Sequence, residues 1–212
     1  MNRPMFYPAV EVSAQQITAW LESGASVVLP TETVYGLAAK AGNPQSADRL
    51  CRLKGRPADM NLPVVIGGIH QLSALGVDFN RTAQVLAKVF WPGPLTLVLG
   101  FSASGARPAW LSGRIEVAVR LPDHDLLREI AVRAGPILLT SANGHGTGPK
   151  TDAHDAVKSL HASPDYVVDA GRLSQIPSTI VNVRVSPALI ERTGAISVAD
   201  VQRLIDSCTL PE

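Results

Sequence analysis

Short runs of β-branched and other apolar residues recur along the whole chain, and amphipathic stretches separate many of them. Runs of this length, bounded by Gly, Pro or polar residues, are typical of strands in a well-buried sheet. The expected strands cover residues 26–29, 33–39, 62–66, 95–101, 115–121, 136–140, 166–170, 178–183 and 188–192. A sheet of this kind must be covered by helices, so the pattern predicts a layered α/β protein.

Helix signals lie between these runs. Ser13 with Gln16 predicts a capping box, and Asp123 and Ser197 are expected to cap two later helices. Two more helices are expected to end near Lys54 and to cover residues 81–90. The order is less regular than repeated βαβ units, which favours a mixed sheet over a parallel one. No linker or repeat divides the chain, so we expect a single domain over residues 1–212.

Composition narrows the function classes. The chain has 212 residues, of which 46% are hydrophobic and 17% charged, an ordinary balance for a globular protein with one sizeable core. Its formal net charge of +1 argues against strong non-specific binding to nucleic acid, which needs a surplus of Lys and Arg. A local basic groove is compatible with this charge.

The sequence also predicts the compartment. It has no run of about eighteen apolar residues that would span a membrane. The first twenty residues lack the basic start and apolar run of a signal peptide. Cys51 and Cys208 lack CxxC spacing and are expected to be thiols in a reducing compartment. We therefore expect a cytoplasmic protein without membrane contact.

A polar cluster, Pro30-Thr-Glu-Thr-Val-Tyr-Gly36, directly follows the strand expected at residues 26–29. Strand-like alternation would place Thr31, Thr33 and Tyr35 on one side. Two hydroxyls and a phenol there could bind a ligand. Taken alone, such a cluster is more often a polar turn than a binding site.

Three further clusters flank expected elements. Lys54-Gly-Arg-Pro57 could clamp phosphates, or its cations could simply complement a helix C-terminus. Thr140-Ser-Ala-Asn-Gly-His-Gly146 could bring backbone N–H groups to an anion, or form a flexible loop. Ser178 and Thr179 open a strand. No P-loop or GxGxxG fingerprint is present.

Other kinds of site are not supported. The five histidines lack HExxH or similar spacing, so no metal site is expected. Ser141 has no GxSxG elbow around it, which argues against a hydrolase triad. Residues 91–94, Trp-Pro-Gly-Pro, are expected to form a rigid turn with a packing role.

Taken in order, the clusters resemble one known family. PTETVYGL, KGRP, WPGPLTLVL, AVRLPDH, TSANGHG and STIVNV are similar to motifs of the YrdC/TsaC-type threonylcarbamoyl-AMP synthases, and the match runs from Val27 to Arg192. The resemblance implies a YrdC-like three-layer α/β domain in which a large twisted mixed sheet encloses a positively charged cavity.

The resemblance also implies an activity. The family's nucleotidyltransferases join L-threonine, bicarbonate and ATP, with Mg²⁺ on the nucleotide, to give threonylcarbamoyl-AMP and pyrophosphate. Downstream transfer proteins then move the threonylcarbamoyl group to an adenosine of tRNA. Two alternatives remain open: a non-catalytic module that binds tRNA or double-stranded RNA, and a paralogue with other nucleotide or carbamoyl chemistry.

Site residues carry over motif by motif. Lys54 and Arg56 correspond to the KxRP pair that faces the phosphates, and we expect them to be catalytic. Arg120 resembles the arginine that clamps the threonine carboxylate. The implied threonine site comprises Thr31, Thr33, Tyr35, Arg120 and Ser178. The implied ATP site comprises Lys54, Arg56, Thr140, Ser141, Asn143 and Arg192.

The sequence departs from the family pattern in two places. The stretch after KGRP lacks a histidine that one branch uses to contact threonine, and its RPxDxxL pattern, with Asp59, resembles the TsaC branch, as do residues 110–114. His145 stands where a serine usually follows SAN, which changes the expected phosphate contact at that position.

Overall fold

The computed structural model describes residues 3–57, 61–103, 105–173 and 176–209. Its described strands form a ten-stranded sheet in the order β1-β8-β2-β3-β7-β4-β6-β5-β9-β10. The strands are β1 (Met5–Pro8), β2 (Val27–Leu29), β3 (Gly36–Lys40), β4 (Val64–Val65), β5 (Leu95–Leu99), β6 (Val117–Arg120), β7 (Ile137–Ser141), β8 (Tyr166–Asp169), β9 (Thr179–Asn182) and β10 (Leu189–Arg192).

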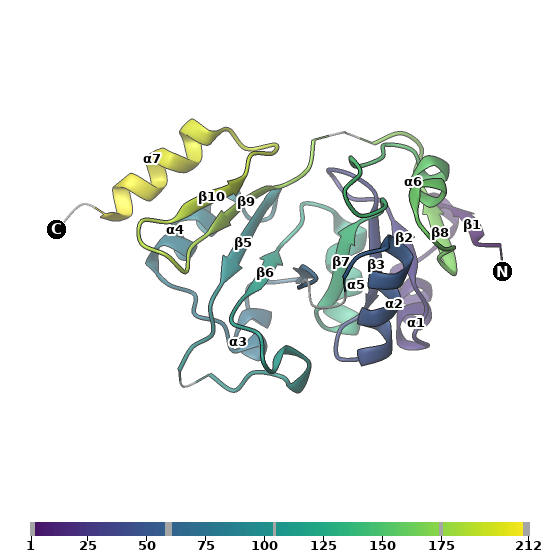
Figure 1. The fold of residues 1–212 in the computed structure, drawn as a ribbon, viewed down its shortest axis with the longest axis horizontal. Helices are drawn as coiled ribbons and strands as arrows, with labels where there is room; N and C mark the ends of the chain where they lie inside the picture. The colour runs from purple at the N-terminus through teal and green to yellow at the C-terminus, as the bar shows by residue number, and fades with distance from the viewer. Residues whose placement is uncertain (1–2, 58–60, 104, 174–175, 210–212) are drawn as a thin grey trace.

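The sheet is mixed, as the irregular order of elements predicts. Strand β8 is parallel to β1 and β2, β4 to β6, and β5 to β9. The pairs β2–β3, β3–β7, β4–β7, β5–β6 and β9–β10 are antiparallel. Figure 1 shows β1, β2, β3, β7 and β8 towards one end of the molecule and β5, β9 and β10 towards the other.

Helices cover both faces of the sheet. They are α1 (Ala14–Glu22), α2 (Pro44–Lys54), α3 (Gln71–Leu75), α4 (Arg81–Phe90), α5 (Asp125–Ala134), α6 (Ala153–Ser159) and α7 (Val198–Thr209), with short 3₁₀ turns at Ala9–Glu11 and Ala109–Leu111. Helices α1 and α5 pack together on one face, and the others contribute to the core on the opposite face. The result is a three-layer arrangement.

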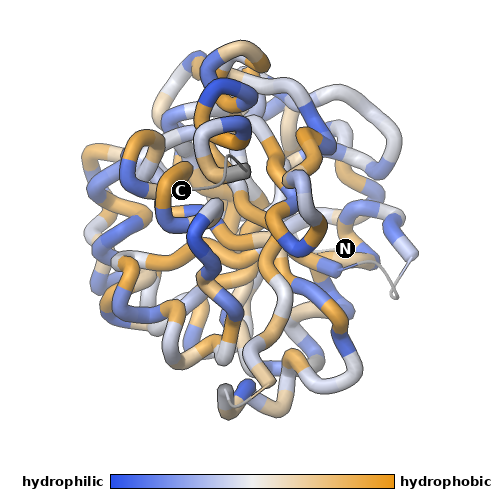
Figure 2. The backbone as a smooth tube through the Cα atoms, turned by 90° about the vertical axis from the view of Figure 1, so that its left-hand side faces the viewer, coloured by the Kyte–Doolittle hydropathy of each residue, from blue (hydrophilic) through white to orange (hydrophobic). Residues whose placement is uncertain are grey.

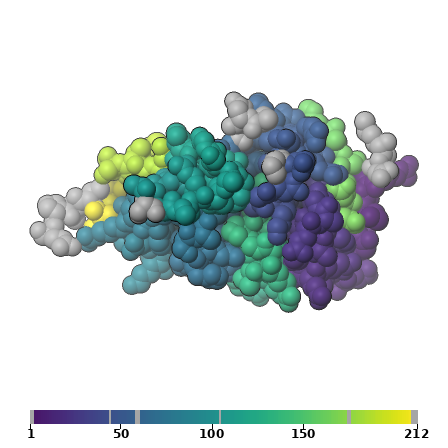
Figure 3. Space-filling model, turned by 90° about the horizontal axis from the view of Figure 1, so that it is seen from below, coloured from purple at the N-terminus to yellow at the C-terminus, as the bar shows by residue number. Residues whose placement is uncertain are grey.

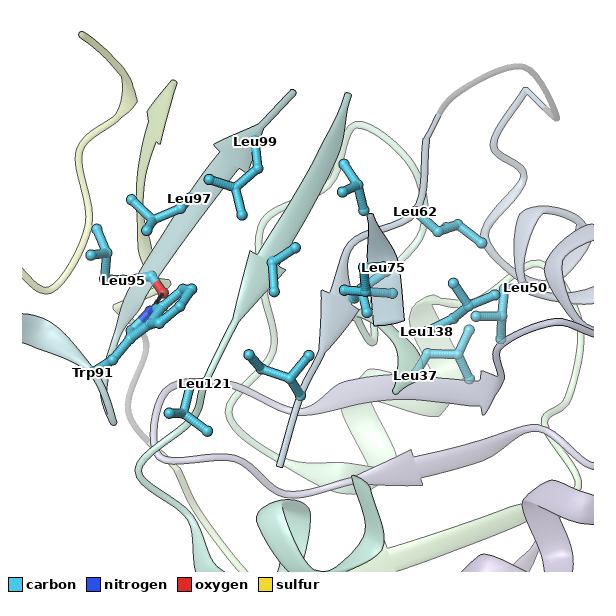
Figure 4. Packing of buried hydrophobic residues seen from close by; sticks show 14 of the residues in the cluster. Leu37, Leu50, Leu62, Leu75, Trp91, Leu95, Leu97, Leu99, Leu121 and Leu138 are labelled. Atoms are coloured by element: carbon cyan, nitrogen blue, oxygen red, sulfur yellow. Dashed lines mark hydrogen bonds between the residues drawn. The ribbon is translucent and has the colours of Figure 1, made fainter. Parts of the chain in front are cut away.

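Two hydrophobic cores lie on the two sides of the sheet. The larger contains residues of β5, β6, α2 and α4, and Figure 4 shows its leucines between Trp91 at one end and Leu50 at the other. The smaller lies under α1 and α5, with Ile17 and Ile130 fully buried. In Figure 2 the apolar segments run through the middle of the molecule and the hydrophilic ones lie outside.

Most local signals in the sequence are confirmed. The Ser13 hydroxyl accepts the Gln16 N–H at 3.2 Å, and the Ser197 hydroxyl accepts the Asp200 N–H at 3.1 Å. The prediction that Asp123 caps α5 is wrong. Its carboxylate instead accepts a hydrogen bond from Arg128 at 3.1 Å, and the helix begins at Asp125 without a side-chain cap.

The sequence patterns missed β1, α3 and α6, which are short. They also predicted that β3 starts too early, because the strand begins at Gly36 rather than at Thr33.

Among the described residues, no helix is long and apolar enough to cross a membrane. Figures 1 and 3 show the N-terminal and C-terminal elements at opposite ends of the molecule.

Candidate active site

A cavity of about 440 Å³ opens beside the central strand β4, within the size range of small-molecule sites. Its walls come from the turn before β3, the end of α2, the loop after β7, and strands β5, β6 and β10. Segments far apart in sequence therefore meet here. The residues predicted from the sequence that line it are Thr31, Thr33, Lys54, Arg56, Arg120, Thr140, Ser141, Asn143, Ser178 and Arg192.

Within the described part of the chain, every ionisable residue that lines the cavity is basic. These residues are Lys54, Arg56, Arg120, His145 and Arg192. No carboxylate is among the described lining residues. A cavity with this lining attracts anions, because the charges lie close together in partly buried positions.

Lys54 and Arg56 form one wall. Gly55 caps α2 in the left-handed conformation, with φ of 62°, and so the chain turns between the two cations. The Lys54 ammonium donates to the Ser141 and Asn143 carbonyl oxygens, the latter at 2.6 Å, which ties α2 to the loop after β7. Arg56 donates to the Asn61 carbonyl at 2.9 Å, and no described residue accepts a hydrogen bond from its buried Nε. An anion bound in the cavity would satisfy that N–H.

Lys54 should take up a proton when an anion binds. Burial, and after it the charge of Arg56, lowers the pKa of Lys54 from 10.5 to about 8. Bound inorganic pyrophosphate would raise this pKa again, so at pH 8 we expect uptake of about half a proton per site. Calorimetric titration in two buffers of different ionisation enthalpy measures the uptake. Lys54→Arg, which stays charged, should lack this contribution and take up fewer protons, and equal uptake by both proteins would contradict the prediction.

The same pKa sets a stability trend of definite sign. Between pH 8 and the ordinary value of 10.5, the unfolded chain binds more protons at this lysine than the folded chain does. The Lys54 contribution to the free energy of unfolding therefore increases with pH across that window.

The loop after β7 is held by Asn143. Its side-chain amide donates to the carbonyl oxygens of Thr147 at 2.5 Å and Gly144 at 3.0 Å. The His145 N–H donates to the Lys54 carbonyl at 2.7 Å. These contacts order a segment that its glycines alone would leave flexible. They also place His145 at the edge of the cavity beside Lys54.

Arg120 on β6 lies on the opposite wall and contacts Glu32, Thr33 and Gly93. Its guanidinium pairs with Glu32 at 2.8 Å and donates to the Thr33 hydroxyl at 3.1 Å and the Gly93 carbonyl at 3.2 Å. The side chains of Arg120 and Glu32 are 11% and 18% exposed, so this is a largely buried ion pair. Burial lowers the pKa of Arg120, and Glu32 opposes the shift, so the guanidinium stays charged.

Arg192 on β10 lies near Arg120 rather than near Lys54. Its guanidinium donates to the Ser178 carbonyl at 2.8 Å and to the Ser178 hydroxyl at 3.0 Å. Burial, and after it the charge of Arg120, lowers the pKa of Arg192. The cavity thus has two cation pairs, Lys54 with Arg56 and Arg120 with Arg192.

Tyr35 is not among the cavity-lining residues, and the predicted alternation with Thr31 and Thr33 is wrong. Residues 31–34 form a turn rather than a strand, because the Thr31 hydroxyl accepts the Thr33 and Val34 N–H groups at 3.0 and 3.1 Å. The buried Tyr35 hydroxyl donates to the Gly171 carbonyl at 2.6 Å and accepts the Ala170 N–H at 3.0 Å. Burial, above all, raises the pKa of Tyr35 to about 12.

Replacing Tyr35 with Phe should therefore cost stability and not ligand binding. The variant loses the hydroxyl that joins β3 to the turn after β8, and we expect the free energy of unfolding to fall by about 1–2 kcal/mol. Urea unfolding measures this loss. Threonine affinity, measured by calorimetry, should stay within about twofold of wild type. A tenfold loss of affinity with unchanged stability would contradict this assignment.

Sequence reasoning missed several residues at the site. Thr96 lines the cavity from β5, although it is a polar residue within the apolar run LTLVL. Glu32 pairs with the Arg120 guanidinium, and the Gly93 carbonyl accepts a hydrogen bond from it. The turn at residues 91–94 therefore positions Arg120 in addition to any packing role. Residues 58–60, which include Asp59 of the RPxDxxL pattern, lie outside the described part of the chain.

Comparison with known proteins shows the family to which the chain is related. The chain is 35% identical over 189 residues to the threonylcarbamoyl-AMP synthase of Pyrococcus abyssi, covering 88% of this chain and 55% of that protein. The crystal structure of P. abyssi Sua5 complexed with L-threonine superposes with a TM-score of 0.80 at 31% identity, over 96% of this chain and 60% of the other. The chain therefore spans little more than half the length of these relatives.

Two further matches bear on the fold and the family. The structure of E. coli YciO superposes with a TM-score of 0.78 at 21% identity, over 93% of this chain and 98% of that one, which supports the fold alone. A protein-family model described as telomere recombination, Sua5/YciO/YrdC, matches residues 19–194. With that match over most of its length, and with a basic cavity beside β4, this chain belongs to the Sua5/YciO/YrdC family.

Proposed function

We propose that this protein is an L-threonylcarbamoyladenylate synthase, a nucleotidyltransferase that forms threonylcarbamoyl-AMP and pyrophosphate from L-threonine, bicarbonate and ATP. The observation that carries the proposal is the pair of cation groups in one cavity. Lys54 and Arg56 suit a triphosphate, and Arg120 suits the carboxylate of an amino acid. The names of the relatives, and the L-threonine in one related structure, support the same substrates.

The ATP subsite lies on the α2 side of the cavity. Lys54 and Arg56 offset the charge of the phosphates, and Thr140, Ser141 and Asn143 line the same wall. The Ser141 and Asn143 carbonyls hold the Lys54 ammonium in place, so the cation is positioned before the ligand arrives. His145 adds an imidazole at the edge of this subsite.

The threonine subsite lies on the β5–β6 side. Arg120 faces the carboxylate, and Thr33 and Ser178 lie next to it. Arg192 contacts Ser178 and is close to Arg120, so it lies on the threonine side of the cavity. We propose that the α-phosphate reaches this side, where Arg192 would stabilise its charge during attack by the carbamate.

The chemistry needs little beyond positioning. The threonine amine and bicarbonate give a carbamate and water. A carbamate oxygen attacks the α-phosphorus of ATP, the bond to the β-phosphate oxygen breaks, and pyrophosphate leaves. Since the carbamate oxygen is already anionic, the attack needs no general base. The cations of the cavity hold both reactants in line and offset the developing charge.

Magnesium fits this scheme as part of the nucleotide. The described residues contain no group of three His, Cys, Asp or Glu side chains that could hold a metal ion, and no carboxylate lines the cavity. We propose that Mg²⁺ enters on the triphosphate and supplies charge neutralisation there. The product then passes to proteins that transfer the threonylcarbamoyl group to tRNA in the cytoplasm.

The decisive experiment is mass spectrometry for threonylcarbamoyl-AMP after incubation of the protein with MgATP, L-threonine and bicarbonate. The adenylate and pyrophosphate should form together, and omitting any substrate should abolish both. Formation of a different adenylate when another amino acid replaces threonine, and none with threonine, would favour a paralogous activity. Absence of any adenylate, together with salt-sensitive RNA binding, would favour the non-catalytic alternative.

A further inference from the structure

Thr96 and Ser178 form a hydroxyl pair in the floor of the cavity. Their Oγ atoms lie 2.8 Å apart, and each residue is only 5% exposed. The two residues are 82 positions apart in sequence and meet because β5 is parallel to β9. Both side chains line the cavity.

A count of hydrogens shows what this pair offers to a ligand. Two hydroxyls carry two hydrogens, and the contact between them uses one. Ser178 also accepts a hydrogen bond from Arg192 at 3.0 Å, which strengthens the Ser178 hydroxyl as a donor. The favoured chain therefore runs from Arg192 to Ser178 to Thr96, and it leaves the Thr96 hydrogen for the cavity.

Two other hydroxyls in the threonine subsite have no such hydrogen to spare. Thr31 donates to the Val34 carbonyl at 2.7 Å, so the contact of 2.9 Å between Thr31 and Thr33 uses the hydrogen of Thr33. Thr33 in turn accepts from Arg120. The hydroxyl hydrogens of Thr31 and Thr33 are therefore both used within the turn, and neither is left for a ligand.

Thr96 lies next to Arg120 in the sheet. The two residues are directly opposed in the antiparallel β5–β6 pair, and both side chains line the cavity. Opposed residues on one face of a sheet have Cβ atoms about 4.5–5.5 Å apart. An amino acid whose carboxylate is held by Arg120 can therefore present its side-chain oxygen to Thr96.

We propose that Thr96 is a specificity-determining residue, whose hydroxyl donates to the side-chain hydroxyl of a β-hydroxy amino acid bound at Arg120. The inference rests on the proposed function and extends it to substrate choice. A buried donor made for a substrate hydroxyl rejects an analogue without one, because the donor is then left unpaired.

The test compares L-threonine with L-2-aminobutyrate, which lacks the hydroxyl. Thr96→Val keeps the shape of the side chain and removes its donor. We expect kcat/KM for threonine to fall about tenfold, with kcat/KM for aminobutyrate and KM for ATP within about twofold. Thr96→Ser restores the donor and should stay within about threefold of wild type. Thr18→Val is the matched control, because the Thr18 hydroxyl is buried on α1 and has no hydrogen-bond partner within the described residues.

Direct calorimetry of threonine binding separates the two proposals. Binding that is weaker in Thr96→Val but not in Thr96→Ser supports the inference even if no adenylate forms, and absent adenylate then overturns only the proposed function. Equal binding by wild type and Thr96→Val overturns the inference. An equal loss of affinity for threonine and aminobutyrate also overturns the inference, because that result indicates a structural role for Thr96. Failure of wild type to bind threonine overturns both proposals.

Discussion

Arg56→Ala is expected to leave a folded protein that forms pyrophosphate at least about a hundredfold more slowly than wild type. Arg56 lines the cavity, and its buried Nε has no hydrogen-bond partner among the described residues, which favours a role towards a ligand. Its hydrogen bond to the Asn61 carbonyl contributes little to stability. Pyrophosphate release under saturating threonine and bicarbonate measures the loss.

Arg52→Ala is the matched control for this prediction. Arg52 lies in the last turn of α2, four residues before Arg56, which follows the end of that helix, and its side chain is exposed and does not line the cavity. The control should retain wild-type turnover and wild-type thermal stability. Wild-type pyrophosphate formation by Arg56→Ala would remove Arg56 from the reaction, whereas equal losses in both variants would indicate a general effect of charge.

Arg120→Leu is expected to have two separate effects. It leaves the buried Glu32 carboxylate without its counter-charge, and the free energy of unfolding should fall by about 3–5 kcal/mol. It also removes the contact to the threonine carboxylate, so threonine affinity should fall more than about tenfold. Urea unfolding and calorimetric titration measure the two effects independently.

The double variant Glu32→Gln/Arg120→Leu separates folding from binding. Glutamine removes the charge and keeps an oxygen for the Asp123 N–H, which Glu32 accepts at 2.7 Å. Most of the lost stability should return, while threonine binding should not. The exposed pair of Arg133 and Glu129 provides a control, because Arg133→Leu should change stability by less than about 1 kcal/mol. Recovery of threonine binding in the double variant would refute the clamp role of Arg120.

Local signals predicted the elements of this fold well. The helix caps at Ser13 and Ser197 and the bounds of α4 follow from interactions within a few residues, so the sequence pattern contains them. Asp123 shows the limit. Aspartate is a common helix cap, but the Asp123 carboxylate accepts a hydrogen bond from Arg128 and its N–H donates to the distant Glu32.

The candidate site could be predicted in composition but not in contacts. Motif resemblance led to Lys54 and Arg120, and both line the cavity. It could not show that Glu32 pairs with Arg120, or that Ser178 lies against Thr96, because β-sheet order brings those residues together. The prediction that Tyr35 shares a side with Thr31 and Thr33 was wrong for a local reason. It assumed strand-like alternation across residues that form a turn.

The concentration of cations in the cavity has a consequence for the rest of the surface. Lys54, Arg56, Arg120 and Arg192 carry four positive charges, and taking these from the formal net charge of +1 leaves the rest of the chain at −3. A free nucleotide is small enough to reach the buried cations. A nucleic acid duplex meets an exterior with a net negative charge, which opposes its binding. The distribution of charge therefore favours small anions that enter the cavity over polyanions that bind to the outer surface.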